Sequence, residues 1–443
     1  MARVISRRKF IKAAGVAGAL AGLSPYVFSS RARAQRPQFR ILQWSHFVPR
    51  YDEWFDPFAR QWGEENGYEV TVDHINLAEL VTRAGAEVGA QEGHDLFGFV
   101  SPPSAFEPAV LDLTDVVSEA QSRYGEIVAW ARRSTYNPVT NKWFGFSDAW
   151  VPDPGDYRKS FWEPLGFPNG PDTYADLLAA APTLRDMGHP VGIGMSQEID
   201  SNMAGRAIIW SFGGSIQDAE GNVAINSPET IAAVEYGARL FQEGMTAEIF
   251  SWNAASNNQA LIAGRASYIL NSISAYRSAQ KTVPEIADDV FFTPALAGPQ
   301  ARFASQHVIP IYVIWNFARQ PDAAKAFLLN LVDHYRDAVI ASELYNFPSF
   351  PGSVPDLNDL VVNDSTSNPP DKLAVLTTAP QWTTNVGHPG VANAAIGEVF
   401  DTFIIPNMFA KAARGDLSPA DAVREAEAQI IPIFQKWREQ GLL

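Results

Sequence analysis

Runs of apolar residues separated by polar turns divide the chain into short predicted strands and amphipathic helices. The first group alternates strand, helix, strand, helix and strand, an order typical of a parallel sheet with crossover helices. Ligands of such sheets bind beyond the carboxyl ends of the strands. The predicted strands are 39–44, 69–75 and 95–100, and the predicted helices are 54–62 and 77–90.

A second group of helices and strands begins near residue 173 and continues to the C-terminus. Within 421–439, apolar residues at 423, 426, 430, 434 and 437 form one stripe of a helix. A chain of 443 residues is too long to fold around a single hydrophobic core, so two α/β domains are expected. The predicted helices are 173–187, with Asp172 as its N-cap, 202–212, 228–243, 254–263, 322–335, 336–345, 391–413 and 421–439. The predicted strands are 191–195, 266–270, 290–293 and 307–313.

Composition narrows the possible classes of function. The chain has no cysteine, which excludes disulfides, zinc–thiolate sites, thiol nucleophiles and a lipid-attachment cysteine. Its formal net charge is -15, and residues 1–34 carry seven Lys and Arg but no Asp or Glu, so the remainder is more acidic still. An acidic body repels nucleic acid and anionic membranes, and we expect neither as a partner.

The N-terminus has the composition of an export signal. Ser6-Arg-Arg-Lys-Phe-Ile-Lys12 resembles the twin-arginine motif, with Ile11 in place of Leu. A short apolar stretch follows at 13–27, and Ala32-Arg33-Ala34 has the form of a cleavage site. We therefore expect residues 1–34 to be a twin-arginine signal peptide, and the mature product to be a free periplasmic protein.

The stretch 136–154 predicts a crossing between two folded units. It opens with a turn at Asn137-Pro138, carries an aromatic run, and ends with Pro152 and Pro154. Proline lacks an N–H and is a poor residue for a central strand. The alternative interpretation is an ordinary hairpin whose aromatic side chains belong to the core.

Five segments of the chain resemble family 1 extracellular solute-binding proteins, the carbohydrate-type receptors of ABC importers. Together they span most of the chain after the signal, in the order and with the gaps that the family shows. The segments are 137–145 (NPVTNKWFG), 157–178 (YRKSFWEPLGFPNGPDTYADLL), 257–266 (NNQALIAGRA), 320–329 (QPDAAKAFLL) and 418–427 (SPADAVREAE).

This resemblance implies a two-lobed periplasmic-binding-protein fold, type II-like, with hinge segments and an interlobe cleft. Lobe 1 would comprise 35–150 and 303–346, and lobe 2 would comprise 151–302 and 347–443. The implied function is capture of a sugar, oligosaccharide or polyol and its delivery to an ABC transporter permease in the inner membrane. The resemblance implies a monomer without enzymatic activity, cofactor or metal. Where such receptors often have glycines, this chain has Gln306 and His307, which we expect to project into the cleft.

A sugar needs flat aromatic faces and planar polar groups that hydrogen-bond in two ways. Each candidate could instead have a purely structural role. An aromatic residue could belong to the core, and a polar residue could cap a helix or lie in a solvated loop. The candidate ligand-binding residues are Trp44, His46, Ser101, Asp148, Trp150, Trp210, Trp252, Asn253, Asn271, Ser272, Gln306, His307, Asn346 and Trp382.

Two other functions remain open from the sequence. An anionic, glycerol-phosphodiester-type solute would require Arg or Lys in the cleft, and the best candidates, Arg158, Arg277 and Arg302, do not lie at strand ends. An exported glycan hydrolase needs only two carboxylates close in space, which no sequence pattern excludes. Calcium binding at 218–229 is not expected, because Gly221 precedes the ligand position that it should follow.

Overall fold

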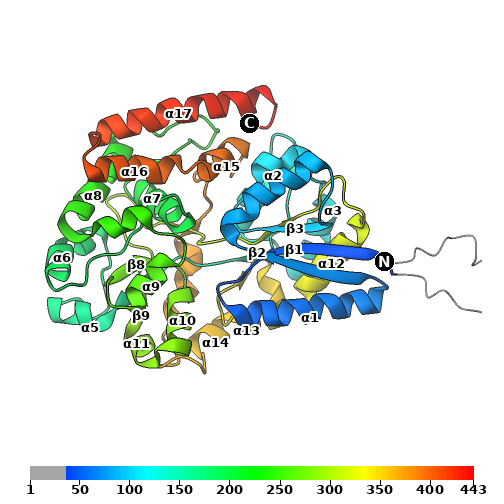
Figure 1. The fold of residues 1–443 in the computed structure, drawn as a ribbon, viewed down its shortest axis with the longest axis horizontal. Helices are drawn as coiled ribbons and strands as arrows, with labels where there is room; N and C mark the ends of the chain where they lie inside the picture. The colour runs from blue at the N-terminus through cyan, green and yellow to red at the C-terminus, as the bar shows by residue number, and fades with distance from the viewer. Residues whose placement is uncertain (1–35) are drawn as a thin grey trace, which may run out of the picture. The chain divides into compact units, whose positions relative to one another are not determined.

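The computed structural model describes residues 36–443, and the predicted signal peptide at 1–34 lies outside them. These residues form two main sheets, each surrounded by helices, and three further sheets of two short strands each (Figure 1). Within this range no helix is both long enough and apolar enough to cross a membrane.

The first sheet confirms the predicted parallel arrangement. Its strand order is β11-β3-β1-β2, with β1 parallel to both β2 and β3 and with β11 antiparallel to β3. β11 is shorter than the predicted strand 307–313, because residues 307 and 308 bond to the crossing segment at Val151 instead. The strands are β1 (Gln38–Trp44), β2 (Glu69–Ile75), β3 (Leu96–Phe99) and β11 (Ile311–Val313).

Helices cover this sheet and bury its aromatic side chains. Phe39 of β1 packs edge-on against Phe327 at 5.9 Å between ring centroids, and Trp62 lies 5.4 Å from the same ring. The first helix begins at a proline and ends at Gly67, whose left-handed φ of 84° closes it. The helices are α1 (Pro49–Asn66), α2 (Leu80–Ala90), α3 (Thr114–Tyr124), α4 (Ala129–Thr135), α12 (Pro321–Asp333) and α13 (Tyr335–Ala341).

The second sheet is antiparallel, in the order β8-β7-β9. The predicted strand 191–195 is wrong, since only Val191 forms an isolated bridge with Tyr268. Asp172 is not the N-cap of α6; Thr173 caps it in a reciprocal capping box with Asp176. The elements are β7 (Gly155–Arg158), β8 (Tyr268–Leu270), β9 (Val290–Thr293), α5 (Lys159–Trp162), α6 (Tyr174–Asp186), α7 (Ile199–Ser211), α8 (Pro228–Gly244), α9 (Ser256–Ile262), α10 (Ser274–Thr282) and α11 (Pro284–Asp289).

The C-terminal part forms three helices where two were predicted. The predicted helix 391–413 is broken into α15 (Ala394–Asp401) and α16 (Ile404–Arg414), because Phe403 adopts a left-handed φ of 54°. α17 (Pro419–Glu439) starts at the Ser418 cap, buries its predicted apolar stripe and packs on α16 (Figure 1). The remaining short elements are α14 (Leu357–Val362) and the 3-10 helices η2 (Leu77–Glu79), η3 (Ser104–Ala109), η4 (Glu163–Leu165), η5 (Ala247–Ser251), η6 (Pro351–Ser353) and η7 (Ala374–Gln381).

Three segments that connect the two halves of the fold, 149–151, 307–308 and 347–348, are hydrogen-bonded to one another. Val151 donates to the carbonyl of Val308 at 3.0 Å and accepts from the backbone N–H of His307 at 2.8 Å. Next to this contact, β6 pairs with β12 in antiparallel fashion. In stretch 136–154, β4 and β5 form a hairpin, as the alternative interpretation expects, and the crossing after it stays a prediction. The short strands are β4 (Tyr136–Asn137), β5 (Lys142–Trp143), β6 (Ala149–Trp150), β10 (Ala304–Ser305), β12 (Phe347–Pro348) and β13 (Thr383–Thr384).

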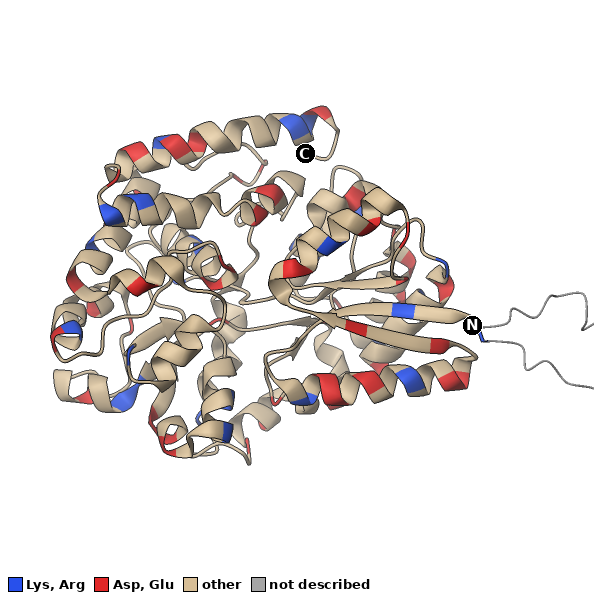
Figure 2. Cartoon of the chain, in the orientation of Figure 1, with Lys and Arg blue, Asp and Glu red and all other residues tan. Residues whose placement is uncertain are grey.

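Charged side chains lie mainly on the outer helices. Figure 2 shows carboxylate and basic residues interspersed along α1 and α17 rather than gathered into one basic stripe.

Candidate functional site

Beside the three connecting segments, the structure buries polar side chains that lack hydrogen-bond partners. We call Asp153, Asp200, Ser272, His307 and Tyr345 the histidine cluster; none is more than 6% exposed. Asp200 Oδ1, Ser272 Oγ, His307 Nε2 and the Tyr345 hydroxyl have no hydrogen-bond partner among residues 36–443. Nearly all buried polar groups in folded proteins are hydrogen-bonded, so such a concentration marks a place where an outside group can bind.

His307 occupies the centre of this cluster. Its Nδ1 lies 3.0 Å from Asp153 Oδ1, and its Nε2 lies 3.6 Å from Asp200 Oδ1. Burial disfavours the charged imidazole, but the hydrogen bond and charge of Asp153 and the charge of Asp200 outweigh burial and raise the pKa of His307. Burial raises the pKa of Asp200, while His307 lowers it. The cluster therefore places the imidazole of His307 between two buried carboxyl groups that favour its charged form.

Tyr345 connects the cluster to predicted site residues on the first sheet. Burial raises the pKa of its hydroxyl, Ser272 opposes this rise, and the charges of Asp200 and Asp153 add to it. Its ring centroid lies 5.0 Å from that of His46. His46 Nδ1 accepts from the Val48 backbone N–H at 2.9 Å, which leaves its Nε2 to donate to Asn346 Oδ1 at 3.3 Å. Burial lowers the pKa of His46 to about 4, so this ring is neutral at pH 7.

Several residues of this region were not predicted from the sequence. Glu198 caps α7, accepting from the backbone N–H groups of Asp200 and Ser201, and Asn257 donates to Asp200 Oδ2 at 2.8 Å. Burial, followed by the charge of Asp200, raises the pKa of Glu198. Asp153 lies between the two prolines of the crossing, a position from which its burial could have been expected.

The structure places the predicted aromatic residues in different surroundings. Trp44 ends β1 and packs on His46, with 4.7 Å between centroids. Trp150 packs on Trp130 in the connecting region and donates to the Pro348 carbonyl at 3.2 Å. Trp252 is half-buried, and Trp382 donates from Nε1 to Thr378 Oγ1 at 3.1 Å, whereas Trp210 Nε1 has no partner among the described residues.

The predicted polar residues also separate into groups. Ser272, His307 and Asn346 lie in or beside the histidine cluster, and Asn271 Oδ1 accepts from the Ser272 backbone N–H at 2.7 Å. Gln306 is buried and reaches Ser134 Oγ at 3.4 Å.

Three other predicted polar residues lie elsewhere. Ser101 is buried after β3. Burial raises the pKa of Asp148 to about 7, and neither of its carboxyl oxygens has a partner within 36–443. Asn253 is exposed, and its side chain bonds locally to the Ala255 backbone N–H.

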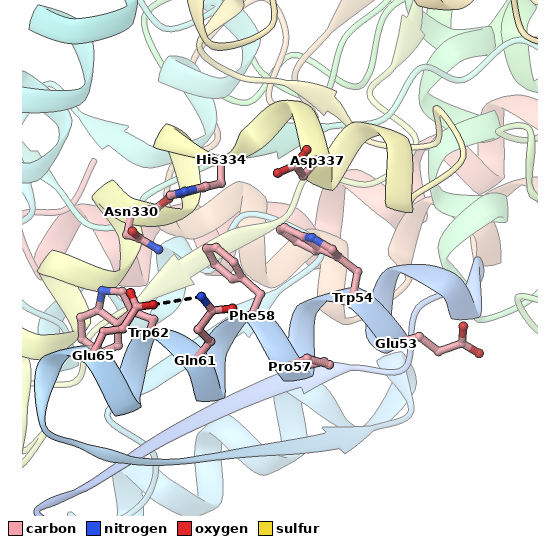
Figure 3. A pocket seen from close by; sticks show the side chains of 10 residues that line it. All are labelled: Glu53, Trp54, Pro57, Phe58, Gln61, Trp62, Glu65, Asn330, His334 and Asp337. Atoms are coloured by element: carbon pink, nitrogen blue, oxygen red, sulfur yellow. Dashed lines mark hydrogen bonds between the residues drawn. The ribbon is translucent and has the colours of Figure 1, made fainter.

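A separate pocket lies between α1 and the junction of α12 and α13 (Figure 3). Its cavity volume is about 410 Å³, and Trp54 and Phe58 form a stacked pair on its α1 side, with 4.8 Å between centroids. His334 lies against Phe58 from the opposite side. None of the predicted site residues lines this pocket.

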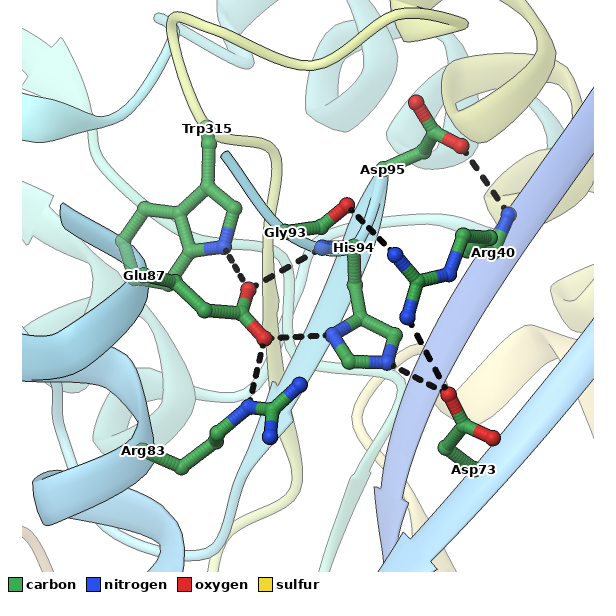
Figure 4. A network of polar contacts seen from close by, with 8 residues as sticks. All are labelled: Arg40, Asp73, Arg83, Glu87, Gly93, His94, Asp95 and Trp315. Atoms are coloured by element: carbon green, nitrogen blue, oxygen red, sulfur yellow. Dashed lines mark hydrogen bonds and ion pairs between the residues drawn. The ribbon is translucent and has the colours of Figure 1, made fainter. Parts of the chain in front are cut away.

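A second buried polar network fastens α2 to the first sheet (Figure 4). His94 Nδ1 lies 2.5 Å from Glu87 Oε1, and its Nε2 lies 2.9 Å from Asp73 Oδ2. Trp315 Nε1 donates to Glu87 Oε2 at 3.1 Å. Burial disfavours the charged form of Glu87, but hydrogen bonds from His94 and Arg83 lower the pKa of its carboxyl to about 2. Because no buried side-chain atom of Glu87, His94 or Trp315 lacks a hydrogen-bond partner, the network contrasts with the histidine cluster and serves the fold.

Metal coordination receives no support from the described part of the chain. Among residues 36–443, no group of three or more His, Asp or Glu side chains is placed to hold a metal ion. Asp218, the first residue of the calcium-like loop, instead accepts from backbone N–H groups of its own turn.

Comparison with known proteins identifies the fold. The sequence model of a family described as bacterial extracellular solute-binding protein matches residues 49–333. No curated protein sequence matches the chain.

Several solved structures resemble the chain across most of its length. Maltose-bound MalE3 of T. maritima is 19% identical, with a TM-score of 0.73 over 89% of this chain and 98% of that one. A solute-binding protein from Agrobacterium radiobacter K84 in complex with ribitol is 17% identical, with a TM-score of 0.71 over 89% and 98%. A sugar transporter structure from Arthrobacter chlorophenolicus A6 with bound laminaribiose is 14% identical, with a TM-score of 0.73 over 89% and 99%. The predicted two-lobed α/β fold is thereby confirmed.

Proposed function

Because the chain belongs to the family of bacterial extracellular solute-binding proteins, we propose that it is the receptor of an ABC importer. It captures a sugar, oligosaccharide or polyol between its two lobes and delivers it to a permease in the inner membrane. Lobe 1 comprises 35–150 and 303–346, and lobe 2 comprises 151–302 and 347–443. The segments hydrogen-bonded around Val151 act as the hinge on which the lobes close.

One observation supports a polyhydroxylated ligand above all: the histidine cluster offers unpartnered hydroxyl, imidazole and carboxyl groups in a buried setting. Such groups both donate and accept, as sugar hydroxyls do, so each ligand hydroxyl can be matched. Structures of the same fold contain maltose, ribitol and laminaribiose. His46, Asn271, Asn346 and Gln306 complete the polar surroundings, and Trp44 supplies an aromatic face.

The remaining features of the proposal follow from the N-terminal motif and the family. The protein leaves the cytoplasm folded, by the twin-arginine route, and works in the periplasm as a monomer. It performs no covalent chemistry, and closure of the lobes signals occupancy to the permease.

A thermal-shift screen of residues 35–443 tests the proposed function. We expect at least one mono- or oligosaccharide or polyol to raise the unfolding midpoint, because a ligand that binds only the native state adds about 2.7 kcal/mol at 100 times its dissociation constant. Aryl glycosides are included as controls for hydrolysis, and their turnover would establish the hydrolase alternative. If only glycerol phosphodiesters shift the midpoint, the protein is a receptor for an anionic solute and not for a neutral saccharide.

A further inference from the structure

One face of α7 carries buried hydrogen-bond donors that no described residue satisfies. Asn202, Arg206 and Trp210 follow one another at four-residue intervals, so they lie on one face at steps of about 6 Å along the axis. None of the three is more than 2% exposed. Arg206 Nε and Nη2, together with Trp210 Nε1, have no hydrogen-bond partner among residues 36–443.

Neighbouring groups fix the orientation of the Arg206 guanidinium. Its Nη1 donates to Asn202 Oδ1 at 2.6 Å and to the Asn202 carbonyl at 3.2 Å, and its Cζ lies 4.9 Å from the centroid of the Phe400 ring. Asn202 is itself held, since its Nδ2 donates to the Phe400 carbonyl at 3.0 Å. The unused Nε and Nη2 groups form one edge of the guanidinium with two parallel N–H bonds. That edge binds a carboxylate or phosphate in bidentate fashion.

The charge of Arg206 is also uncompensated. The three arginines considered from the sequence each form an ion pair: Arg158 with Asp289 at 2.7 Å, Arg277 with Asp364 at 2.8 Å and Arg302 with Asp172 at 2.7 Å. Within residues 36–443, Arg206 forms no ion pair at 4.0 Å or less. A buried cation without a counter-charge is costly, so an anion from outside would be strongly favoured there.

The nearby acid compensates this charge only in part. Burial raises the pKa of Asp401 to about 7, although Arg206 acts in the opposite direction, so about half of this carboxyl is uncharged at pH 7. Burial likewise lowers the pKa of Arg206 to about 9, which leaves the guanidinium charged at pH 7. Asp200 of the histidine cluster lies six residues earlier on α7, on another face and about 9 Å away along the axis.

We propose that Arg206 and Trp210 form a subsite for the acidic group of a polyhydroxylated ligand. The inference rests on the proposed function and narrows its substrate class to acidic saccharides, with a carboxylate (a uronic or aldonic acid) or a phosphate as the recognised group. The Arg206 edge binds the acidic group in bidentate fashion, and Trp210 Nε1 supplies a third donor. The histidine cluster binds the hydroxyl groups of the same ligand.

Calorimetric titration of residues 35–443 with matched ligands tests the subsite. Glucuronate is compared with glucose, galacturonate with galactose, and glucose 6-phosphate with both sugars. We expect one acidic ligand to bind at least about tenfold more tightly than its neutral partner, the scale of one charge-assisted hydrogen bond. Preference for the sugar phosphate over the uronates would assign the subsite to phosphate, and the reverse order would assign it to carboxylate.

Variants of the arginine decide whether Arg206 is responsible. Arg206→Gln should abolish the preference for the acid, measured as the ratio of the affinities for the acidic and the neutral sugar. Arg206→Lys keeps the charge but lacks the edge with two parallel N–H bonds, so it should lose part of the preference. This variant tests the same prediction if the glutamine variant does not fold. Arg302→Gln, which removes a more exposed arginine paired with Asp172, is the matched control and should behave as wild type.

The outcomes separate this inference from the proposed function. Equal or tighter binding of neutral sugars, or a preference that survives in Arg206→Gln, would overturn the acidic subsite and leave the saccharide receptor standing. If no neutral or acidic saccharide binds at all, both the proposed function and the subsite are wrong.

Discussion

Replacing His307 with leucine should lower the free energy of unfolding by about 3–5 kcal/mol, the cost of removing one partner from a buried ionic group. The variant leaves Asp153 and Asp200 buried without their shared cation, and neither can reach water, since they are 1% and 6% exposed. Chemical denaturation at pH 6 measures the difference. His334→Leu is the control, because His334 is exposed and bonds only to the carbonyl of its own helix.

The cost of His307→Leu should also depend on pH with a definite sign. The pKa of His307 is raised in the folded protein, so its stabilising contribution is complete below the unfolded value of about 6.5 and is lost as pH rises through the folded value. The difference between wild type and variant should therefore shrink as pH increases above about 6.5. A difference below about 1 kcal/mol at pH 6, or one that grows with pH, would contradict the charged assignment.

Arg277→Met should cost a similar amount, about 3–5 kcal/mol, although Arg277 lies outside the proposed site. Its Nη2 donates to buried Asp364 at 2.8 Å, and its Nε donates to the Glu343 carbonyl at 2.9 Å, so the side chain fastens α10 to two other segments. Arg302→Gln, which breaks a more exposed pair, should cost only about 0–1 kcal/mol under the same denaturation conditions. Equal effects of the two substitutions would show that burial of the Arg277 pair adds nothing to its contribution to the free energy of unfolding.

Elements with strong local patterns could be predicted from the sequence. The predicted strand 69–75 has the same bounds as β2, and the apolar stripe and the Ser418 cap predict α17. Predictions failed where tertiary contacts override local preference. Residues 191–195 look like a strand but only bridge Tyr268, and the break at Phe403 requires a left-handed conformation that a bulky residue rarely adopts.

The candidate site could be predicted only in part. Four of its residues could be predicted. His46 and Ser272 follow predicted strands, His307 stands where related receptors often have glycine, and Asn346 ends the predicted lobe 1. Asp200 and Arg206 lie on different faces of a helix whose faces are all buried, so no periodicity distinguishes the residues that serve a ligand. Their significance rests on which atoms lack partners, and that information exists only in three dimensions.

The central claim is that the unpartnered atoms of the histidine cluster serve a ligand rather than the fold. Ser272 and Tyr345 lie beside one another, so the double variant Ser272→Ala/Tyr345→Phe removes both hydroxyls without leaving either alone. Removing the two hydroxyls together leaves neither without its neighbour and costs the empty protein little, whereas each lost ligand hydrogen bond weakens binding.

The most direct measurement is therefore one titration and one melt of wild type and this double variant, using the ligand that gives the largest thermal shift. The account predicts an unfolding midpoint, without ligand, that is unchanged or raised, together with an affinity reduced by about tenfold or more. An unchanged affinity combined with a lowered midpoint would show that the two hydroxyls stabilise the fold and that the ligand binds elsewhere.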